Sequence, residues 1–306
     1  MPVPLIEILS ILTVLIPLLS IILLGISRYD SLIGWIIKTL LAASLVLFAY
    51  SAGTWAFLTY YLRYVMMALF LIIFARAYFK VRGLPFFGKK ESGIKTGILF
   101  FILSVLIILD AAVIKSHFYP GEAVELSFPL KKGVYYVLQG GDSPVTNFFH
   151  RANPAQRYAL DLVKLNRFGN RAGGLSPKSL TEYSIFGDTI YSPCECIVTK
   201  AADGFPDQVP HNVDTKNPAG NHVAMECKGN RVFIAHMING SLMVKQGDHI
   251  KDGQEIGKVG NSGNTIEPHL HIHAERKNGE PVPILFNGSF LSLNDTFCNQ
   301  FTLYCH

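Results

Sequence analysis

The chain has 306 residues, a formal net charge of +5 and a mean hydropathy of +0.31. Its Lys and Arg residues form no dense basic stripe interleaved with aromatic residues, so we expect no nucleic-acid partner. Half of the residues are hydrophobic, but these are concentrated before residue 117, and all ten histidines lie from that point onward. The sequence therefore predicts two regions, an apolar region at residues 1–116 and one soluble domain at residues 117–306.

Four apolar stretches in the first region are long enough for membrane-spanning helices, which need roughly 20 mainly apolar residues. They lie at about residues 4–25, 32–50, 55–75 and 93–114. The first stretch has no preceding Lys or Arg and no small-residue cleavage site after it, so we interpret it as a retained helix and not as a signal peptide. The sequence thus predicts a helical transmembrane region of four helices.

The segment after the third stretch is rich in basic residues and predicts the orientation of the chain. It carries a single acid, Glu91, against Lys80, Arg82, Lys89, Lys90 and Lys95. The positive-inside rule places such a segment in the cytoplasm. We therefore expect the domain that follows the fourth helix to be extracytoplasmic.

Three basic residues lie inside or near the ends of the apolar stretches. A charge within a membrane marks a functional site by default, but Lys38 and Arg76 are close enough to helix ends to reach the membrane surface. Arg63 lies near mid-span if the third helix begins at Trp55, and it then needs a partner. A transporter or sensor role for the helices remains the alternative to a lipid-embedded anchor.

From about residue 187 the chain alternates short β-prone runs with turns rich in Gly, Pro and Asn. This pattern predicts a mainly-β domain with an antiparallel sheet. The expected strands are residues 189–191, 196–199, 222–227, 231–236, 249–250, 255–259 and 269–275.

Three histidines alternate in the last of these strands, at His269, His271 and His273. Residues two apart in a strand point to the same face, so the three imidazoles share one side of the sheet. A single core histidine is unremarkable, whereas three on one face need water, a metal or a substrate as partners. The trio therefore indicates a metal site or a general base, with His273 as a group that supports His271.

A set of spaced elements resembles the closing signature of the lysostaphin/LytM zinc metallopeptidase family. The elements are Val-Lys-Gln-Gly-Asp at 244–248, Gly-Gln-Glu-Ile-Gly at 253–257, Gly-Asn-Ser-Gly-Asn-Thr at 260–265 and Pro-His-Leu-His at 268–271. Upstream, Phe-Ile-Ala-His at 233–236 and Tyr-Ala-Leu-Asp at 158–161 are similar to two further segments of that family. The resemblance covers roughly residues 140–287 and implies a lysostaphin-like fold.

The resemblance also implies roles for individual residues. Asp161 and His271 would coordinate one zinc ion, while His236 and His269 would flank it and serve catalysis. Zinc in such sites takes three N or O ligands and activates a water molecule for attack on a carbonyl. The implied substrate is a peptide bond of bacterial peptidoglycan or another extracytoplasmic peptide, and the implied location is the bacterial cytoplasmic membrane.

One position departs from the family pattern. Most members carry a metal-binding His four residues before the Asp, but this chain has Arg157, and a protonated guanidinium cannot ligate zinc. We favour His150 as the substitute ligand, although it fits equally well as a solvated loop residue. Asn147 is a candidate for the family's Asn ligand. A catalytically degenerate domain that binds cell wall or activates another hydrolase is therefore the alternative function.

All five cysteines lie in the second region. If the domain is extracytoplasmic, Cys298 could pair with Cys305, and Cys227 could pair with Cys194 or Cys196. Free buried thiols are an equally good interpretation. The remaining histidines have no companion at ligand spacing, and we expect solvated or core-edge roles for His211, His222, His249 and His306. The segment at residues 167–188 reads as an insertion that borders a substrate groove.

Overall fold

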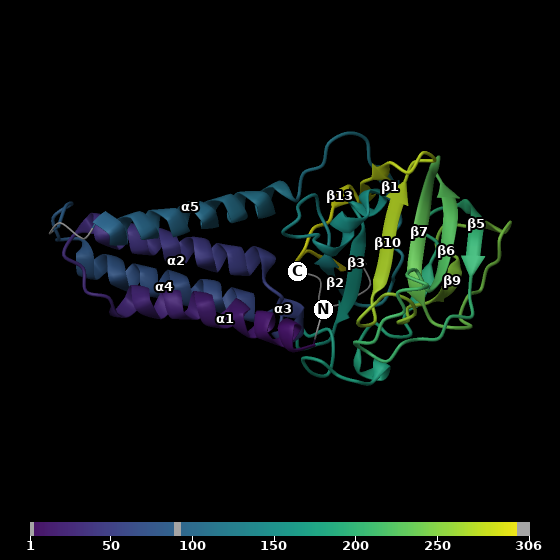
Figure 1. Ribbon diagram of the computed structural model, residues 1–306, viewed down its shortest axis with the longest axis horizontal. Helices are drawn as coiled ribbons and strands as arrows, with labels where there is room; N and C mark the ends of the chain where they lie inside the picture. Colours follow the sequence, from purple (N-terminus) through teal and green to yellow (C-terminus); the bar gives the residue numbers. More distant parts are fainter. Residues whose placement is uncertain (1–2, 89–92, 299–306) are drawn as a thin grey trace.

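The computed structural model describes residues 3–88 and 93–298 of the chain and divides into a helical bundle and a β-domain (Figure 1). The bundle extends away from one end of the β-domain, and α5 leads from it into the first strand. The helices are α1 (Val3–Ile26), α2 (Leu32–Ala52), α3 (Trp55–Leu58), α4 (Leu62–Val81) and α5 (Gly93–Lys115).

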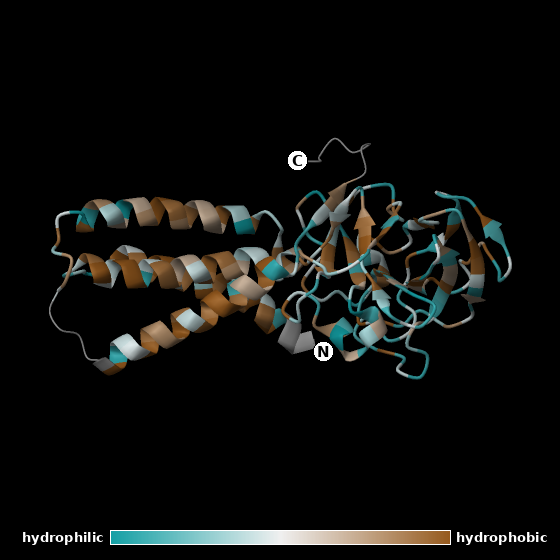
Figure 2. Cartoon of the chain, turned by 90° about the horizontal axis from the view of Figure 1, so that it is seen from above, coloured by the Kyte–Doolittle hydropathy of each residue, from teal (hydrophilic) through white to brown (hydrophobic). Residues whose placement is uncertain are grey.

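The four long helices are apolar enough to cross a membrane, as the sequence predicts. The candidate spans are Glu7–Ile26, Leu32–Ala52, Leu62–Val81 and Ile94–Lys115. Hydrophobic residues cover the helices along most of their length, whereas the surface of the β-domain is mixed (Figure 2). Many outward-facing side chains of the bundle are large and apolar, for example Phe101 and Ile108. A surface of this kind is suited to contact with lipid.

The prediction that a single helix begins at Trp55 is wrong. The chain forms the short helix α3, breaks at Thr59, which has an extended backbone, and starts α4 at Leu62. Arg63 therefore lies in the first turn of α4, beside the β-domain, and not near the middle of a span. Its guanidinium stacks 3.8 Å from the centroid of the Tyr50 ring, and its Nη1 donates to the carbonyl of Asn294 at 3.2 Å. Arg63 thus joins the bundle to the β-domain.

Polar groups also connect helices inside the bundle. The hydroxyl of Ser44 in α2 donates to the carboxylate of Asp110 in α5. Trp55 of α3 is fully buried, and its indole Nε1 donates to the carbonyl of Ala49 at 2.7 Å. The Ser44 hydroxyl and the Trp55 indole each find a partner in a neighbouring helix or turn, which offsets the cost of burying them.

The β-domain is built on one large antiparallel sheet, which confirms the predicted fold class. Its strand order is β14-β2-β3-β10-β7-β6-β5-β8, and β11 pairs with β10. The strands are β2 (Val134–Gln139), β3 (Leu160–Leu165), β5 (Cys196–Ala202), β6 (Asn221–Cys227), β7 (Asn230–Met237), β8 (His249–Ile250), β10 (Leu270–Glu275), β11 (Pro281–Val282) and β14 (Thr296–Cys298).

Two smaller sheets complete the domain. One joins β1 (Val124–Leu126), β12 (Ile284–Phe286) and β13 (Ser289–Phe290), and its β1–β12 pair is parallel. The other pairs β4 (Thr189–Tyr191) with β9 (Glu255–Lys258). In these two smaller sheets, every strand except β13 contributes buried apolar side chains to the core under one face of the large sheet.

Strand β10 shows how the sequence separates the core from the opposite face. Leu270, Ile272 and Ala274 lie in the hydrophobic core, because alternate residues of a strand point to the same side. The intervening His271 and His273 lie on the other face, where they line a groove. The predicted strand at residues 269–275 therefore has the expected alternation.

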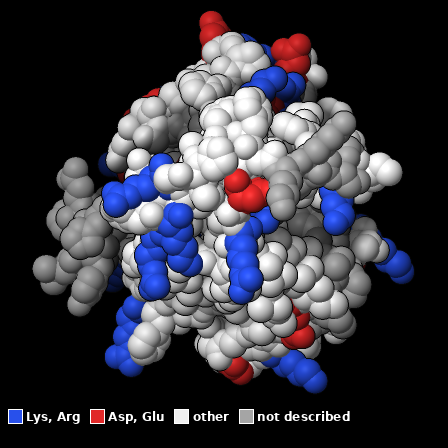
Figure 3. Space-filling view, turned by 90° about the vertical axis from the view of Figure 1, so that its left-hand side faces the viewer, with Lys and Arg blue, Asp and Glu red and all other residues white. Residues whose placement is uncertain are grey.

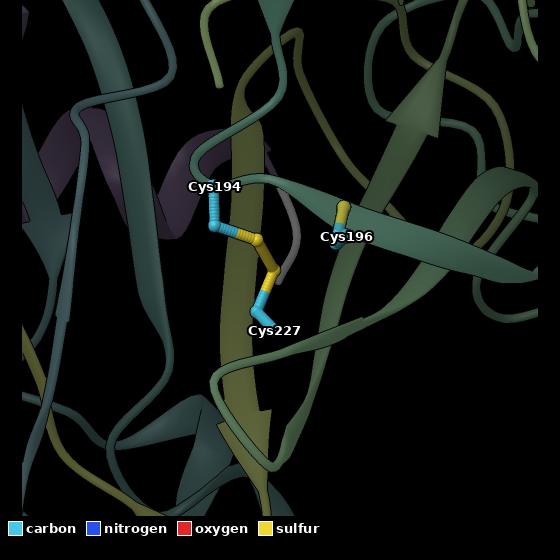
Figure 4. A group of neighbouring side chains, drawn as sticks. All are labelled: Cys194, Cys196 and Cys227. Atoms are coloured by element: carbon cyan, nitrogen blue, oxygen red, sulfur yellow. A yellow bond between two sulfur atoms is a disulfide. The ribbon is translucent and has the colours of Figure 1, made fainter. Parts of the chain in front are cut away.

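A disulfide joins Cys194 to Cys227, with 6.1 Å between their Cα atoms and a sequence separation of 33. Cys196 lies beside it as a buried free thiol (Figure 4). Of the two partners that the sequence offers Cys227, the structure thus selects Cys194. A cross-link that closes a loop of this size stabilises a fold by about 3–4 kcal/mol through the unfolded chain. The expected pair of Cys298 with Cys305 cannot be followed, because Cys305 lies outside the described residues.

The expectation that the segment at residues 167–188 borders the groove is wrong, because its start packs against the bundle and its end packs into the β-domain. The amide of Tyr60 donates to the carbonyl of Gly169 at 2.8 Å, and the hydroxyl of Thr59 donates to the carbonyl of Phe168 at 2.6 Å. No residue of this segment is among the described residues that line the groove. Gly169 and Asn170 permit a tight turn that brings main-chain groups against α3 and the break after it.

Candidate metal centre

Neighbouring strands bring Asp161 and His271 together. In the register of the large sheet, His271 of β10 lies opposite Asp161 of β3 on one side and Ala235 of β7 on the other. The Nδ1 atom of His271 is 2.9 Å from Oδ1 of Asp161. Both side chains lie on the groove face of the sheet.

His150 approaches the same carboxylate from a 3₁₀ turn, η1 (Phe149–Ala152). Its Nε2 is 3.3 Å from Oδ1 of Asp161, and its ring centroid is 5.0 Å from that of His271. The other ring nitrogen, Nδ1, is 2.6 Å from the side-chain oxygen of Asn147. His150 is buried, so the structure places it in the cluster and not on a solvated loop.

Asn147 holds the turn that carries His150. Its amide nitrogen lies within hydrogen-bond distance of the carbonyls of Gly141, Arg157 and Ala159, and its side chain is fully buried. Its amide oxygen lies 2.6 Å from Nδ1 of His150, and this contact orients the ring so that Nε2 faces Asp161. Asn147 therefore orients a candidate ligand and does not itself face the carboxylate.

Arg157 points away from the cluster. Its Nε and Nη2 atoms donate to the two carboxylate oxygens of Asp142 at 2.8 and 2.9 Å. This partner raises the pKa of the Arg157 guanidinium. The residue that stands where the family carries a ligand is thus part of an ion pair next to the site.

His236 and His269 flank the cluster, and both are tied to main-chain carbonyls. Nδ1 of His236 is 2.8 Å from the carbonyl of Ser262, and Nδ1 of His269 is 2.9 Å from the carbonyl of Glu267. Each Nδ1 must carry the hydrogen for these bonds, which leaves Nε2 free to exchange a proton. The Nε2 atom of His269 lies 3.4 Å from Oδ1 of Asp161.

The backbone of His236 is strained. Its φ angle is +63°, a left-handed conformation that costs a residue with a side chain about 1–3 kcal/mol. Two main-chain bonds hold it there, from its amide to the carbonyl of Ala219 and from the amide of Gly260 to its own carbonyl. Such strain is typical of residues whose side chain must be aimed at a site.

His273 supports His271 as the strand alternation predicts. Its Nδ1 is 2.9 Å from Nε2 of His271, and its ring stacks on Phe233 with 4.7 Å between centroids. Burial lowers the pKa of His273 to about 2, so this imidazole is neutral. It therefore fixes the orientation of His271 without adding charge.

The environments of the cluster shift its pKa values in different directions. Burial alone raises the pKa of Asp161, but the His150 and His269 imidazoles outweigh it and hold that pKa well below its usual range. Burial lowers the pKa of His236 strongly and that of His271 as well. For His269, burial opposes the Asp161 carboxylate, and the net effect is a raised pKa.

The donor set fits a transition metal such as zinc. His150, Asp161 and His271 each offer one donor atom, and these atoms all lie within 4.8 Å of one another. His236, His269 and His271 form a second group of the same compactness. Two imidazoles and a carboxylate match the ligands of catalytic zinc sites. The cluster opens into a groove of about 1100 Å³, which is large enough for a peptide segment.

The remaining histidines stay outside the cluster. His222 lines the groove, but its Nδ1 is tied to the carbonyl of Gly220 at 2.7 Å. His249 is exposed in β8, and neither ring nitrogen of His211 has a hydrogen-bond partner among the described residues. His306 lies outside the described residues. The carbonyls of Ser262 and Glu267 fix the tautomers of His236 and His269. The sequence does not predict these contacts, because every residue has a main-chain carbonyl.

Several solved structures are similar to this chain. A zinc-containing peptidase from Vibrio cholerae is 19% identical over 52% of this chain and 39% of its own, with a TM-score of 0.31. A putative peptidase M23 from Pseudomonas aeruginosa is 18% identical over 57% of this chain and 56% of its own, with a TM-score of 0.30. Lysostaphin is 17% identical over 44% and 40%, with a TM-score of 0.26. The match thus spans less than two thirds of each of these proteins.

Residues 184–283 match the model of Peptidase family M23. The matched range contains His236, His269 and His271, whereas His150 and Asp161 precede it. The chain therefore carries a Peptidase family M23 domain, preceded by four helices long and apolar enough to span a membrane.

Proposed function

We propose that the chain is a membrane-anchored zinc metallopeptidase that hydrolyses peptide bonds in peptidoglycan. One observation carries the proposal: three metal donors from His150, Asp161 and His271 converge beside two further imidazoles, those of His236 and His269, in one groove. Hydrolysis of an amide needs charge stabilisation and proton transfer at the same place. The cluster brings together residues suited to both.

The residues divide between holding the metal and moving protons. His150, Asp161 and His271 would hold zinc, which when bound would supply polarisation of the peptide carbonyl and activation of water. The lowered pKa of His236 keeps its imidazole neutral at pH 7, so its free Nε2 is available as a proton acceptor. His269 has a raised pKa, so its Nε2 can carry a proton and donate to the developing oxyanion.

The helical bundle supports an anchored, outward-facing arrangement. The end of the bundle farthest from the β-domain gathers Lys and Arg side chains (Figure 3). The described basic residues there include the exposed Arg28, Lys80, Arg82 and Lys95. Positively charged loops favour the cytoplasmic side of a membrane, which leaves the β-domain outside, where peptidoglycan lies.

The test is zinc content and peptidoglycan digestion by the full-length protein in detergent. Elemental analysis should find about one zinc per chain, and mass spectrometry should find new amino and carboxyl termini in the digested wall peptides. Both should disappear in His271→Ala and Asp161→Ala and after treatment with a chelator. His222→Ala is the matched control, because this histidine lines the groove outside the cluster and should leave both readouts unchanged.

The alternative is a degenerate domain that binds cell wall without cutting it. Its main support is Arg157, which stands at the position of the usual His ligand. A wild-type protein that takes up no zinc under saturating metal, yet sediments with peptidoglycan, would replace the peptidase proposal with this one.

A further inference from the structure

A buried ion pair lies between the helical bundle and the candidate catalytic site. The Arg171 guanidinium donates from Nε to Oε1 of Glu267 at 2.8 Å and from Nη2 to Oε2 at 2.7 Å. The two side chains are only 1% and 3% exposed. This two-point contact fixes both the distance and the plane of the two groups.

On one side, Arg171 is attached to α3. Its amide donates to the carbonyl of Ala56 at 2.9 Å, and its guanidinium lies 3.5 Å from the centroid of the Phe57 ring. Its Nη2 also donates to the carbonyl of Leu175 at 2.8 Å. Phe57 is buried, so the ring covers one face of the guanidinium and excludes solvent from it.

On the other side, Glu267 is attached to His269. The main-chain carbonyl of Glu267 accepts the Nδ1–H of His269 at 2.9 Å, and the hydroxyl of Thr265 donates to the same carbonyl at 2.8 Å. This bond selects the tautomer of His269 and aims its Nε2 at Asp161. A displacement of Glu267 therefore displaces the imidazole.

Stability alone does not account for the pair. Removing two charges from water costs several kcal/mol per ion before their attraction offsets it, and apolar residues of similar volume often stabilise a fold as well. A pair held at two points, stacked on an aromatic ring, supplies something that apolar packing does not, namely a fixed geometry. That geometry connects α3 in the bundle to an imidazole in the groove.

We propose that Arg171 and Glu267 are positioning residues through which α3 sets the orientation of His269. The helical bundle is then a functional part of the peptidase and more than its anchor. This inference rests on the proposed peptidase function. A misplacement of about 1 Å at a reacting group can reduce turnover about 100-fold, so the contact has a measurable effect on catalysis.

The kinetic test uses full-length variants, beginning with Phe57→Ala, which changes the bundle and leaves the β-domain sequence intact. We expect kcat to fall about 10-fold or more with KM nearly unchanged and about one zinc per chain retained, because substrate contacts and metal donors are untouched. Phe57→Tyr keeps an aromatic face and should restore most of kcat. Phe79→Ala, in an exposed ring at the far end of α4, is the matched control.

A second variant addresses the ion pair itself. Glu267→Gln preserves the size and the main-chain carbonyl but removes the charge, and it should lower kcat by a similar factor with zinc retained. Lys164→Gln removes one partner of another partly buried ion pair, Lys164 with Asp188, and should leave kcat unchanged. Wild-type kcat in both Phe57→Ala and Glu267→Gln would overturn the inference.

A further measurement does not depend on activity. Hydrogen–deuterium exchange of the full-length protein should show faster exchange at residues 264–270 in Phe57→Ala than in wild type, and no change there in Phe79→Ala. Faster exchange confined to residues 166–175 would show that α3 is not coupled to His269 and would overturn the inference. A wild-type protein without hydrolytic activity would contradict the proposed function, while the exchange result would still decide the coupling.

Discussion

The two sides of the candidate metal centre are built in different ways. His236 lies in β7, His271 lies in β10, and His269 lies in the turn just before β10. All three fall in the range that matches a known family. His150 comes from a 3₁₀ turn outside that range. On the strand side, alternation and register determine where each imidazole points. On the turn side, the direction of the His150 ring depends on contacts with surrounding residues.

The turn side needs more support for the same result. Asn147 connects three main-chain carbonyls and the ring of His150, whereas His271 is positioned by its own strand and by His273. Arg157, which occupies the position of the family's His ligand, is paired with Asp142. The comparison teaches that an imidazole on a turn can reach the same carboxylate as an imidazole on a strand, provided that other side chains fix the turn.

The largest effect should come from the strand side. His271→Ala removes the residue that contacts both Asp161 and His273, so we expect zinc content and hydrolysis to fall to background. The loss should exceed the about 10–100-fold reduction typical of a residue that only supports a ligand. Metal analysis and wall digestion measure this loss. A variant that keeps one zinc per chain would show that His271 is not a required ligand.

The next effect decides the role of His150. His150→Ala should remove most of the bound zinc, because Asp161 and His271 alone leave two of the three proposed donors. Zinc titration with a competing chelator gives the affinity. Full affinity and full turnover in this variant would show that His150 is only a neighbour of the site.

A smaller effect should follow from Asn147→Ala. This change keeps every proposed ligand but frees the His150 ring, so zinc affinity should fall by about 10–100-fold with the stoichiometry unchanged. The same titration measures it. An affinity equal to that of the wild type would mean that the turn holds His150 without the amide.

The smallest effect should come from Arg157. Its side chain is 40% exposed, so losing its ion pair in Arg157→Gln should cost less than about 1 kcal/mol in the free energy of unfolding. Zinc content should not change, and Arg157→His should not raise it, because this side chain faces Asp142. A second zinc or a tighter site in Arg157→His would show that the family position is still usable.

Much of the fold could be predicted from residue patterns. The strands between residues 189 and 275 follow from alternation and from the glycine-rich turns, and each lies within two or three residues of its predicted bounds. The break after α3 could not be predicted, because residues 55–75 are mainly apolar or aromatic, with only Thr59 and Arg63 as exceptions, and contain no Gly or Pro. Contacts of Thr59 and Tyr60 with the loop at Phe168 and Gly169 accompany the break, and such long-range contacts are not written in local sequence.

The parts of the candidate site that lie on regular strands could be predicted from the sequence, and the parts that depend on turns and main-chain contacts could not. The alternation of His271 and His273 predicts that they share one face of a strand. The segment that contains Asp161 resembles a segment of the peptidase family. The proximity of His150 to Asp161 depends on a turn fixed by Asn147, and the tautomers of His236 and His269 depend on carbonyls. Neither has a periodic signature, so only the folded chain reveals them.

The separation of the cluster along the chain has a consequence for biosynthesis. Asp161 and His271 are 110 residues apart and meet only when β3 pairs with β10. A nascent chain therefore holds an incomplete set of donors until β10 has been made, when most of its 306 residues already exist. The helices are synthesised and available for insertion long before that point. In the proposed peptidase, the helices would therefore enter the membrane before the donor set is complete and before hydrolysis is possible.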